Sequence, residues 1–195
     1  MRHAQPLVRR LHAGDAEELH ALRLEALEAH PEAFLTDASE HRGGGLQRTR
    51  RRLEEASASE SEACTFGAFD GALDGAELVG MIGVIRDVRL KQRHRACIVS
   101  VYVRADQRRR GQARRLMEAA LSFAHGLPGV ELVYLSTASS NEPALRLYRS
   151  FGFVAWGTEP DAGRTVSGPF DEVHLQLRRT PGRAERQQHQ HEQPE

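Results

Sequence analysis

The sequence lacks an excess of charge of either sign, because its 27 basic and 27 acidic residues balance over 195 positions. Lysine is nearly absent, and apart from Lys91 all of this positive charge comes from arginine. A protein dedicated to nucleic-acid binding usually carries a basic excess, since phosphate contacts dominate its affinity. The balance therefore argues against a nucleic-acid partner, and any basic patch must be local.

Cysteine and long apolar runs are also scarce. Cys64 and Cys97 are the only cysteines, and their spacing fits neither a disulfide framework nor a zinc site. Both lie in strand-like runs, which favours buried free thiols. No run approaches the roughly 20 apolar residues of a membrane-spanning helix, and the N-terminus lacks the apolar segment of a signal peptide. We therefore expect a cytoplasmic protein with no metal site and no membrane partner.

The N-terminal part combines an edge strand with two helices. Residues 5–12 resemble a short edge strand, and Asp15 followed by Glu18 has the spacing of a helix capping box. The next helix has an apolar face formed by Leu19, Leu22, Ala26 and Leu27. The polar segment 37–62 predicts a loop and then a helix over 46–56. The arginines of this helix are expected to form a solvated face balanced by nearby glutamates; they are Arg48, Arg50, Arg51 and Arg52.

The pattern then changes to strands joined by short polar turns. The runs 64–69, 78–87 and 96–103 predict an antiparallel meander. A helical apolar stripe over 111–125 and a strand over 130–135 follow, and together with 96–103 they form a crossover unit that pairs two strands in parallel.

The remaining elements complete a single α/β domain over residues 1–178. A second helix is expected from Asn141 to just before Gly152, with closing strands over 153–157 and 172–178. The fold class is therefore a mixed sheet with an antiparallel N-terminal half and one parallel crossover. The polar tail 179–195 is expected to be disordered, and its His189 and His191 are not sufficient for a metal site.

The stretch DQRRRGQARRLMEAAL, residues 106–121, places three arginines and Gly111 directly before the apolar stripe. The first turn of a helix has backbone N–H groups without intrahelical partners, and its dipole favours an anion. Gly111 has no Cβ to hold a ligand away, so the turn suits a diphosphate. The alternative is an ordinary helix start with solvated arginines. Neither a Walker loop nor a Rossmann fingerprint is present.

These residues resemble a signature of the GNAT superfamily of acetyl-CoA-dependent N-acetyltransferases. Arg108-Arg109-Arg110-Gly111-Gln112-Ala113 is similar to the family's Gln/Arg-x-x-Gly-x-Gly/Ala motif. Asn141-Glu142-Pro143-Ala144-Leu145-Arg146-Leu147-Tyr148, followed by Phe151-Gly152-Phe153, resembles its second signature. The order of elements agrees with the family over about residues 5–178, and in that fold the fourth and fifth strands splay apart.

The resemblance implies acetyl-CoA as co-substrate, an amine acceptor and a set of site residues. Backbone N–H groups from 109 to 114 would hold the CoA diphosphate, and the end of the strand at 101–103 would pair with the pantetheine arm. The implied cofactor-binding residues are Val101, Tyr102, Val103, Arg108, Arg109, Arg110, Gly111, Gln112, Ala113, Arg114 and Asn141. Tyr148 would be the general acid that protonates the departing thiolate.

The spacing of the two polar residues in the second signature is consistent with this reading. Asn141 and Tyr148 are about two helical turns apart, so they lie on nearly the same face, and Asn141 suits a helix N-cap. Tyr148 also falls in an apolar stripe, so the role of a core aromatic stays open. Some family members carry a Glu where this chain has Ser136, and the general base is therefore left unnamed, with Asp171 and Glu172 as weak candidates.

Three functions remain open at this point. The first is an N-acetyltransferase acting by direct attack, and the second is a catalytically weak acyl-CoA-binding or regulatory module of the same fold. The third, a nucleic-acid binder using 48–52 and 108–115, is disfavoured by the charge balance. The acceptor is expected to contact 31–45 and 158–170, which carry no readable signature. Dimers are common in the family, so a homodimer is also an expectation of the resemblance.

Overall fold

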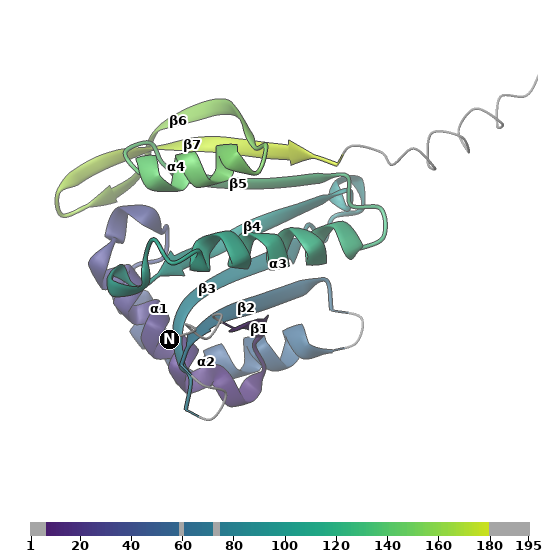
Figure 1. The fold of residues 1–195 in the computed structure, drawn as a ribbon. Helices are drawn as coiled ribbons and strands as arrows, with labels where there is room; N and C mark the ends of the chain where they lie inside the picture. Colours follow the sequence, from purple (N-terminus) through teal and green to yellow (C-terminus); the bar gives the residue numbers. More distant parts are fainter. Residues whose placement is uncertain (1–6, 59–60, 72–74, 180–195) are drawn as a thin grey trace, which may run out of the picture.

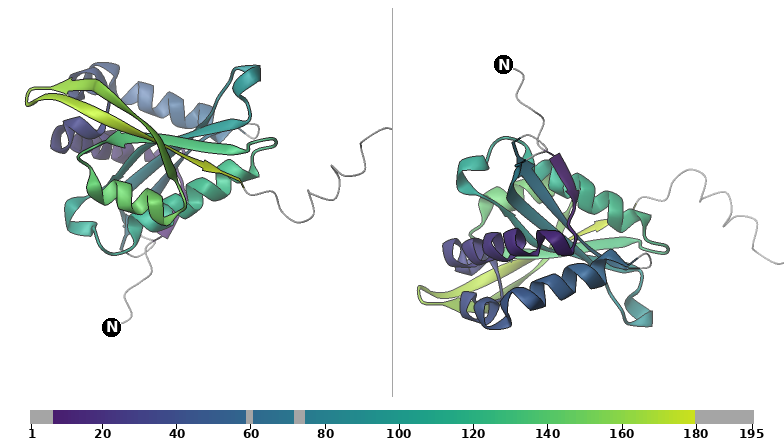
Figure 2. Two further views of the ribbon diagram at one scale, coloured as in Figure 1. Left: turned by 90° about the horizontal axis from the view of Figure 1, so that it is seen from above. Right: turned by 90° about the horizontal axis from the view of Figure 1, so that it is seen from below.

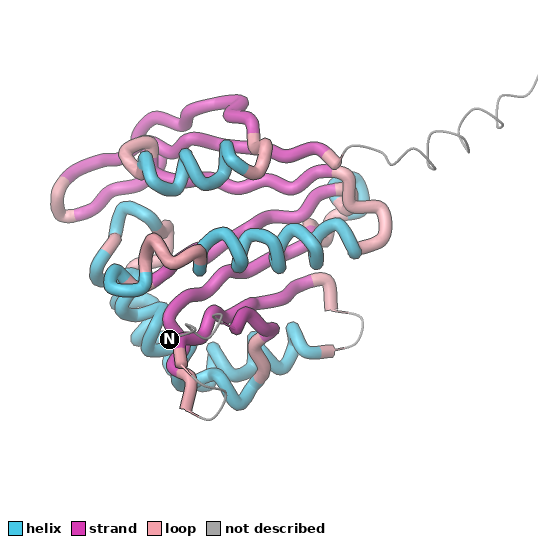
Figure 3. Tube along the Cα trace, in the orientation of Figure 1, coloured by secondary structure: helices cyan, strands magenta, loops and turns pink. Residues whose placement is uncertain are grey.

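A computed structural model describes residues 7–58, 61–71 and 75–179. Its strands form one sheet (Figure 1; Figure 3), and they are β1 (Leu7–Arg10), β2 (Ala63–Asp70), β3 (Glu77–Arg86), β4 (Arg95–Val103), β5 (Leu132–Ala138), β6 (Val154–Thr165) and β7 (Gly168–Arg178). The helices are α1 (Ala16–Ala29), α2 (Ala38–Ser57), α3 (Gln112–Gly126) and α4 (Glu142–Ser150). The predicted disorder of the tail concerns residues that, apart from Arg179, lie outside this description.

The sheet has the order β1-β2-β3-β4-β5-β7-β6. β1 to β4 pair antiparallel, and β4 pairs parallel with β5. This confirms the predicted mixed sheet, in which β1 is an edge strand and α3 makes the crossover. The seven strands lie between two layers of helices, with α1 and α2 on one face and α3 and α4 on the other (Figure 2).

Each face of the sheet has its own apolar cluster. On the α3 face, the predicted stripe of α3 is buried against β2 to β5 at positions including Leu116, Met117 and Ala120. On the α1 face, Leu19, Leu22 and Ala26 pack against β2, β3 and β4. Because side chains alternate along a strand, β3 and β4 contribute to both clusters and form the centre of the molecule.

The predicted capping box at α1 is wrong. The Asp15 carboxylate makes no bond to the first turn of α1. It instead accepts hydrogen bonds from the His12 N–H (2.8 Å) and from the Arg9 guanidinium (2.6 and 2.8 Å). Burial raises the pKa of Asp15, but these hydrogen bonds outweigh that effect and hold the pKa below its ordinary value. Asp15 thus joins β1 to α1 in place of capping the helix.

Helix α2 begins earlier than predicted, because Asp37 and Glu40 form a capping box at its start. The Asp37 carboxylate accepts from the Ser39 N–H (2.7 Å), and Glu40 accepts from the Asp37 N–H (3.2 Å). The helix is interrupted only at Gly45, whose φ of 65° and ψ of 172° are not helical. The glycine run suggested a loop, but one glycine at a kink is sufficient to accommodate it.

Candidate active site

The two strands of the parallel pair, β4 and β5, separate after a short contact. Their register runs from Arg95 opposite Leu132 to Cys97 opposite Tyr134, although β4 continues to Val103. On its other side β5 pairs with β7 along its whole length, from Leu132 opposite Arg178 to Ala138 opposite Glu172. Figure 1 shows β4 and β5 close together at one end and apart at the other. The predicted divergence of these strands is therefore present.

A bulge in β4 accounts for the separation. Gly83 of β3 lies opposite Val99 and Met81 opposite Tyr102, so the single residue Ile82 faces both Ser100 and Val101. Ser100 has a φ of 58°, which is rare for a residue with a side chain. A bulge bends its strand and increases the local twist. It therefore turns the last residues of β4, including the predicted Val101 to Val103, away from β5.

The turn before α3 leaves its backbone donors free. Arg109 and Gly111 both have left-handed backbone, with φ of 62° and 81°. The first helical hydrogen bond runs from the Arg115 N–H to the Gly111 carbonyl (3.1 Å), so the N–H groups of 112–114 have no intrahelical partner. A Cβ at Gly111 would meet nothing within 4 Å. The N-terminal end of α3 is thus open to an anion.

The side chains of this turn divide into structural and free ones. Arg108 donates to the Val103 carbonyl (3.1 Å), and Arg114 donates to the Ser150 hydroxyl (3.1 Å). Arg109 is exposed and makes no hydrogen bond or ion pair with the described residues, and Arg110 lies 3.8 Å from Asp70. Gln112 is buried, and its Oε1 has no partner there. The unpaired charge of Arg109 fits an anionic ligand, whereas the Gln112 oxygen is an acceptor and would need a donor.

Asn141 and Tyr148 lie at the two ends of α4. Asn141 Oδ1 accepts from the Ala144 N–H (3.2 Å), which confirms the predicted N-cap. Tyr148 is 4% exposed, and its ring lies 6.1 Å from that of Phe153. Burial raises the pKa of Tyr148 well above its ordinary value. Its hydroxyl makes no hydrogen bond with another described residue, so the group is a protonated donor with no acceptor of its own.

The α1 face of the diverging strands carries a buried carboxylate. Leu135 and Leu175 pack on the α3 side, so the alternating Ser136 and Glu172 point to the opposite face. Glu172 is 6% exposed and close enough to Cys97 to raise the pKa of that thiol. No hydrogen bond or ion pair to its carboxylate is found within the described ranges.

The other candidate bases have structural roles or are remote. The Asp171 carboxylate accepts from the Asp161 N–H (2.9 Å) and is exposed. His174 lies 3.0 Å from Glu159 in the β6–β7 hairpin. Burial, the largest effect, raises the pKa of Cys97 to about 11, so this cysteine is a neutral thiol near pH 7 and not a nucleophile.

The closing strands are longer than expected, because β6 and β7 cover most of 158–170 and extend toward a turn at 166–167. The arginines of α2 are exposed or partly exposed, as expected, and Arg51 pairs with Glu55 (2.8 Å). In addition, Arg48 and Arg52 line a pocket with Arg23 of α1.

A family model now identifies this architecture. The model of the acetyltransferase (GNAT) family matches residues 19–153, which is more than half of the chain. The chain belongs to the GNAT acetyltransferase family. The match includes both signatures, the bulged β4 and the start of α3.

Curated GNAT relatives match part of the chain. An L-methionine sulfoximine/L-methionine sulfone acetyltransferase of Pseudomonas aeruginosa is 32% identical over 85 residues, which is 44% of this chain and 49% of that protein. A spermidine N(1)-acetyltransferase of Vibrio cholerae is 27% identical over 77 residues, 40% of this chain and 44% of that protein. The chain thus spans about half the length of the curated relatives it matches.

Solved GNAT structures share the fold over most of the chain. A GNAT acetyltransferase from Streptococcus pneumoniae has a TM-score of 0.70 at 22% identity and covers 89% of this chain and 99% of its own. A putative acetyltransferase from Salmonella typhimurium, solved with its cofactor acetyl-CoA, has a TM-score of 0.72 at 17% identity and covers 92% and 99%. These likenesses confirm the mixed α/β fold.

Two other kinds of feature are absent from the described residues. No three His, Cys, Asp or Glu side chains lie together as a metal site in that part of the chain. None of its helices is both long and apolar enough to cross a membrane.

Sequence reasoning missed Arg23 and Ser100, and it gave Glu172 little weight. No sequence signal marks Ser100, since a bulge depends on how β3 and β4 align. Arg48 and Arg52 did leave a signal: they are one helical turn apart, with Gly44 and Ala56 as the next residues on that row. Arg48 has no carboxylate three or four residues away, and Glu55, three residues after Arg52, pairs with Arg51 instead.

Proposed function

We propose that this GNAT protein is an N-acetyltransferase that moves an acetyl group from acetyl-CoA to an amine. The observation that carries the proposal is the divergence of β4 and β5 beyond Cys97. It places unpaired β4 backbone between the open start of α3 on one face and the carboxylate of Glu172 on the other. Acetyl transfer needs a thioester and an amine to meet from two sides, and this arrangement supplies such a place.

The residues on the α3 face suit acetyl-CoA. The free N–H groups of 112–114 and the open space at Gly111 would take the diphosphate, with Arg109 and Arg110 adding charge. The backbone of 101–103 would pair with the pantetheine arm and polarise the acetyl carbonyl. Asn141 keeps its amide N–H groups available for the same arm, since its oxygen is used by the N-cap.

The reaction moves two protons off the nitrogen when the acceptor starts as an ammonium. One leaves before attack, so that the neutral amine forms a bond to the acetyl carbon while the carbon–sulfur bond breaks. The second leaves as the amide forms; the thiolate gains one proton, and the other goes to solvent. We assign the donor role to Tyr148, which burial keeps protonated. We assign Glu172 to attract the ammonium and accept its proton, because this largely buried side chain has a carboxylate that makes no ion pair with the described residues and is open to a cation. With Glu172 in this role, the lack of a carboxylate at Ser136 does not favour a module without turnover.

Release of CoA thiol tests the proposal. The purified protein is incubated with acetyl-CoA and a panel of amines, and thiol release is followed with a chromogenic disulfide. We expect release that depends on an amine, with mass spectrometry showing the acetylated product. Tight binding of acetyl-CoA without amine-dependent release from any amine would instead identify a binding module.

A further inference from the structure

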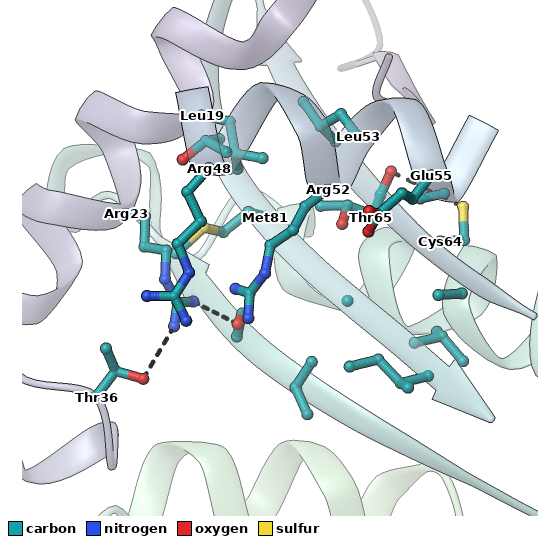
Figure 4. A pocket seen from close by; sticks show the side chains of 18 of the residues that line it. Leu19, Arg23, Thr36, Arg48, Arg52, Leu53, Glu55, Cys64, Thr65 and Met81 are labelled. Atoms are coloured by element: carbon teal, nitrogen blue, oxygen red, sulfur yellow. Dashed lines mark hydrogen bonds between the residues drawn. The ribbon is translucent and has the colours of Figure 1, made fainter. Parts of the chain in front are cut away.

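A pocket of about 330 Å³ lies between the helices α1 and α2 and the face of β2, β3 and β4 (Figure 4). One side of it is cationic, formed by Arg23 from α1 and by Arg48 and Arg52 from α2. Arg23 is half-buried, whereas Arg48 and Arg52 are exposed at the mouth. The rest of the wall is largely apolar and includes Leu19, Leu53, Met81 and Val99.

These three arginines form no ion pair with described residues, and Glu55, which also lines the pocket, pairs with Arg51 instead. The other arginines of α2 have carboxylate partners: Arg42 pairs with Glu28, Arg50 with Glu17 (3.7 Å) and Arg51 with Glu55 (2.8 Å). In the part of the chain that the structure describes, no carboxylate lies within ion-pair distance of Arg23, Arg48 or Arg52. The arginines of one helix thus divide into a paired set and an unpaired set.

The unpaired guanidinium groups are close enough to repel one another. The pKa of Arg23 is lowered by burial first, and then by the positive charges of Arg52 and Arg48. Arg48 and Arg52 are one helical turn apart, where like charges destabilise a helix. Such a cluster opposes folding, and an anion bound between the arginines would relieve it.

The cluster is held beside the bulge of β4. Arg23 Nη1 donates to the Ser100 hydroxyl (2.5 Å) and Nη2 to the Thr36 hydroxyl (3.5 Å), both shown as dashed lines in Figure 4. Ser100 is the bulge residue next to the proposed acetyl position at 101–103. Val99 lines the pocket from the same face of β4 as Cys97, which interacts with Glu172. The cationic side therefore adjoins the proposed site of transfer.

We propose that Arg23, Arg48 and Arg52 bind the carboxylate of the acceptor, so that the acceptor is an amino acid or a close derivative. This rests on the proposed N-acetyltransferase function. Guanidinium groups match a carboxylate with paired hydrogen bonds, and the apolar wall takes the side chain. Glu172 receives the amino group on the other side. A polyamine such as spermidine has no anionic group and is repelled by the cluster.

Acetyl transfer to this acceptor forms one bond for each bond that it breaks. Its amino nitrogen forms the bond to the acetyl carbon while the carbon–sulfur bond of acetyl-CoA breaks. The ammonium loses one proton to Glu172 before it attacks and a second as the amide forms; the thiolate gains one proton, and the other goes to solvent. The acceptor's carboxylate takes no part in these bond changes, so its contribution is to binding.

The test compares acids with their amides. The wild type is assayed for CoA release with the standard L-amino acids and L-methionine sulfone, with the amide of each, and with spermidine. In parallel, thermal shift in the presence of CoA measures binding of the same compounds without turnover. Arg48→Gln/Arg52→Gln is the test variant, Arg52→Lys retains the charge, and Arg42→Gln is the control, because Arg42 is exposed on the same helix outside the pocket.

We expect at least one acid to be preferred over its amide by about tenfold or more in kcat/KM, since charge-assisted paired hydrogen bonds are among the strong ones. The double variant should lose this preference while its affinity for acetyl-CoA is unchanged. Arg52→Lys should keep part of the preference and Arg42→Gln all of it. Spermidine should be a poor acceptor for the wild type. The double variant should not have a lower kcat/KM for spermidine than the wild type.

Several results would overturn the inference. Equal use or equal binding of acids and amides would do so, as would preference for spermidine, or an unchanged acid preference in the double variant. If no amine supports turnover, the proposed function fails. The thermal shifts then still show whether the pocket binds a carboxylate. Stabilisation by an acid and not by its amide would then support the carboxylate site alone, and its absence would refute it.

Discussion

At the scale of single residues, Tyr148 and Glu172 are largely buried side chains whose polar atoms make no hydrogen bond with described residues and are not sealed from solvent. Such atoms are available to a ligand. Substrates would provide the missing partners: a thiolate for the Tyr148 hydroxyl and an ammonium for the Glu172 carboxylate. The two lie on opposite faces of the diverging strands, as a donor and an acceptor of protons in one transfer should.

Tyr148→Phe tests the role of the hydroxyl directly. The substitution keeps the ring packed against Phe153 and removes only the proton donor. Turnover of an accepted amine should fall by about 10²–10⁴-fold, the usual range for general acid catalysis. The melting temperature should hardly change, because the hydroxyl makes no hydrogen bond with described residues. Unchanged turnover in the folded variant would leave Tyr148 as a core aromatic.

The pH profile gives a second readout of the same role. A general acid acts in its protonated form, which is present below its pKa. Burial raises the pKa of Tyr148 above the ordinary value of about 10. The wild-type kcat should therefore not fall as pH rises to about 9, the range just below that ordinary value. A decline centred well below that range would point to a different acid.

At the scale of elements, the start of α3 and the bulge in β4 define the site between them. The bulge turns β4 from β5, and the turn at 104–111 brings the chain from the end of β4 to the start of α3. Two left-handed residues in this turn, Arg109 and Gly111, direct the following N–H groups outward. Of these, Gly111 is suited to that backbone, whereas Arg109 adopts it at a cost.

Gly111→Asp should abolish the affinity for acetyl-CoA, because its carboxylate would occupy the diphosphate position and repel it. Gly111→Asn is the matched control, since asparagine has the same shape, tolerates left-handed backbone and carries no charge. We expect calorimetry to show at least tenfold weaker binding for Asp than for Asn, about 1.4 kcal/mol. Equal affinities for the two variants would contradict a phosphate cradle at this turn.

At the scale of the whole molecule, an arginine closes the end of the sheet where β4 and β5 still pair. Arg86, at the end of β3, donates to Glu62 (2.7 Å) and to the carbonyls of Arg93 (2.6 Å) and Pro128 (2.7 Å). These partners precede β2, lie between β3 and β4, and lie between α3 and β5. One buried side chain thus joins three connections, and the divergence at the other end depends on this closed end.

Arg86→Ala should lower the free energy of unfolding by about 3 kcal/mol, because it leaves a carboxylate and two carbonyls without their buried partner. Arg93→Ala is the control: Arg93 also pairs with Glu62 but is partly exposed, so it should cost less than about 1 kcal/mol. Urea unfolding measures both. Similar losses for the two variants would show that Arg86 does not have this special position.

The sequence alone was sufficient for those elements whose signals are local. The stripe of α3, the N-cap at Asn141, the meander and the crossover follow from spacing and turn residues, and the two signatures indicated the family. Local signals also gave two wrong predictions. Three consecutive glycines suggested a loop where α2 is already helical, and Asp15 has the spacing of a helix cap but binds Arg9. A carboxylate binds the strongest donors within reach, and the chain order does not reveal which these are.

Only the tertiary structure decided which distant residues meet. Arg23, Arg48 and Arg52 come from two helices, and Ser100 and Glu172 from strands on either side of β5. The pairing of β3 with β4 imposes the bulge, and the alternation of side chains then sets which face Glu172 occupies. Helix periodicity is a property of neighbours along the chain, whereas a charged pocket and a diverging pair of strands depend on packing between elements. For that reason the start of α3 and the N-cap of α4 could be predicted from the sequence, and the cluster of Arg23, Arg48 and Arg52 could not.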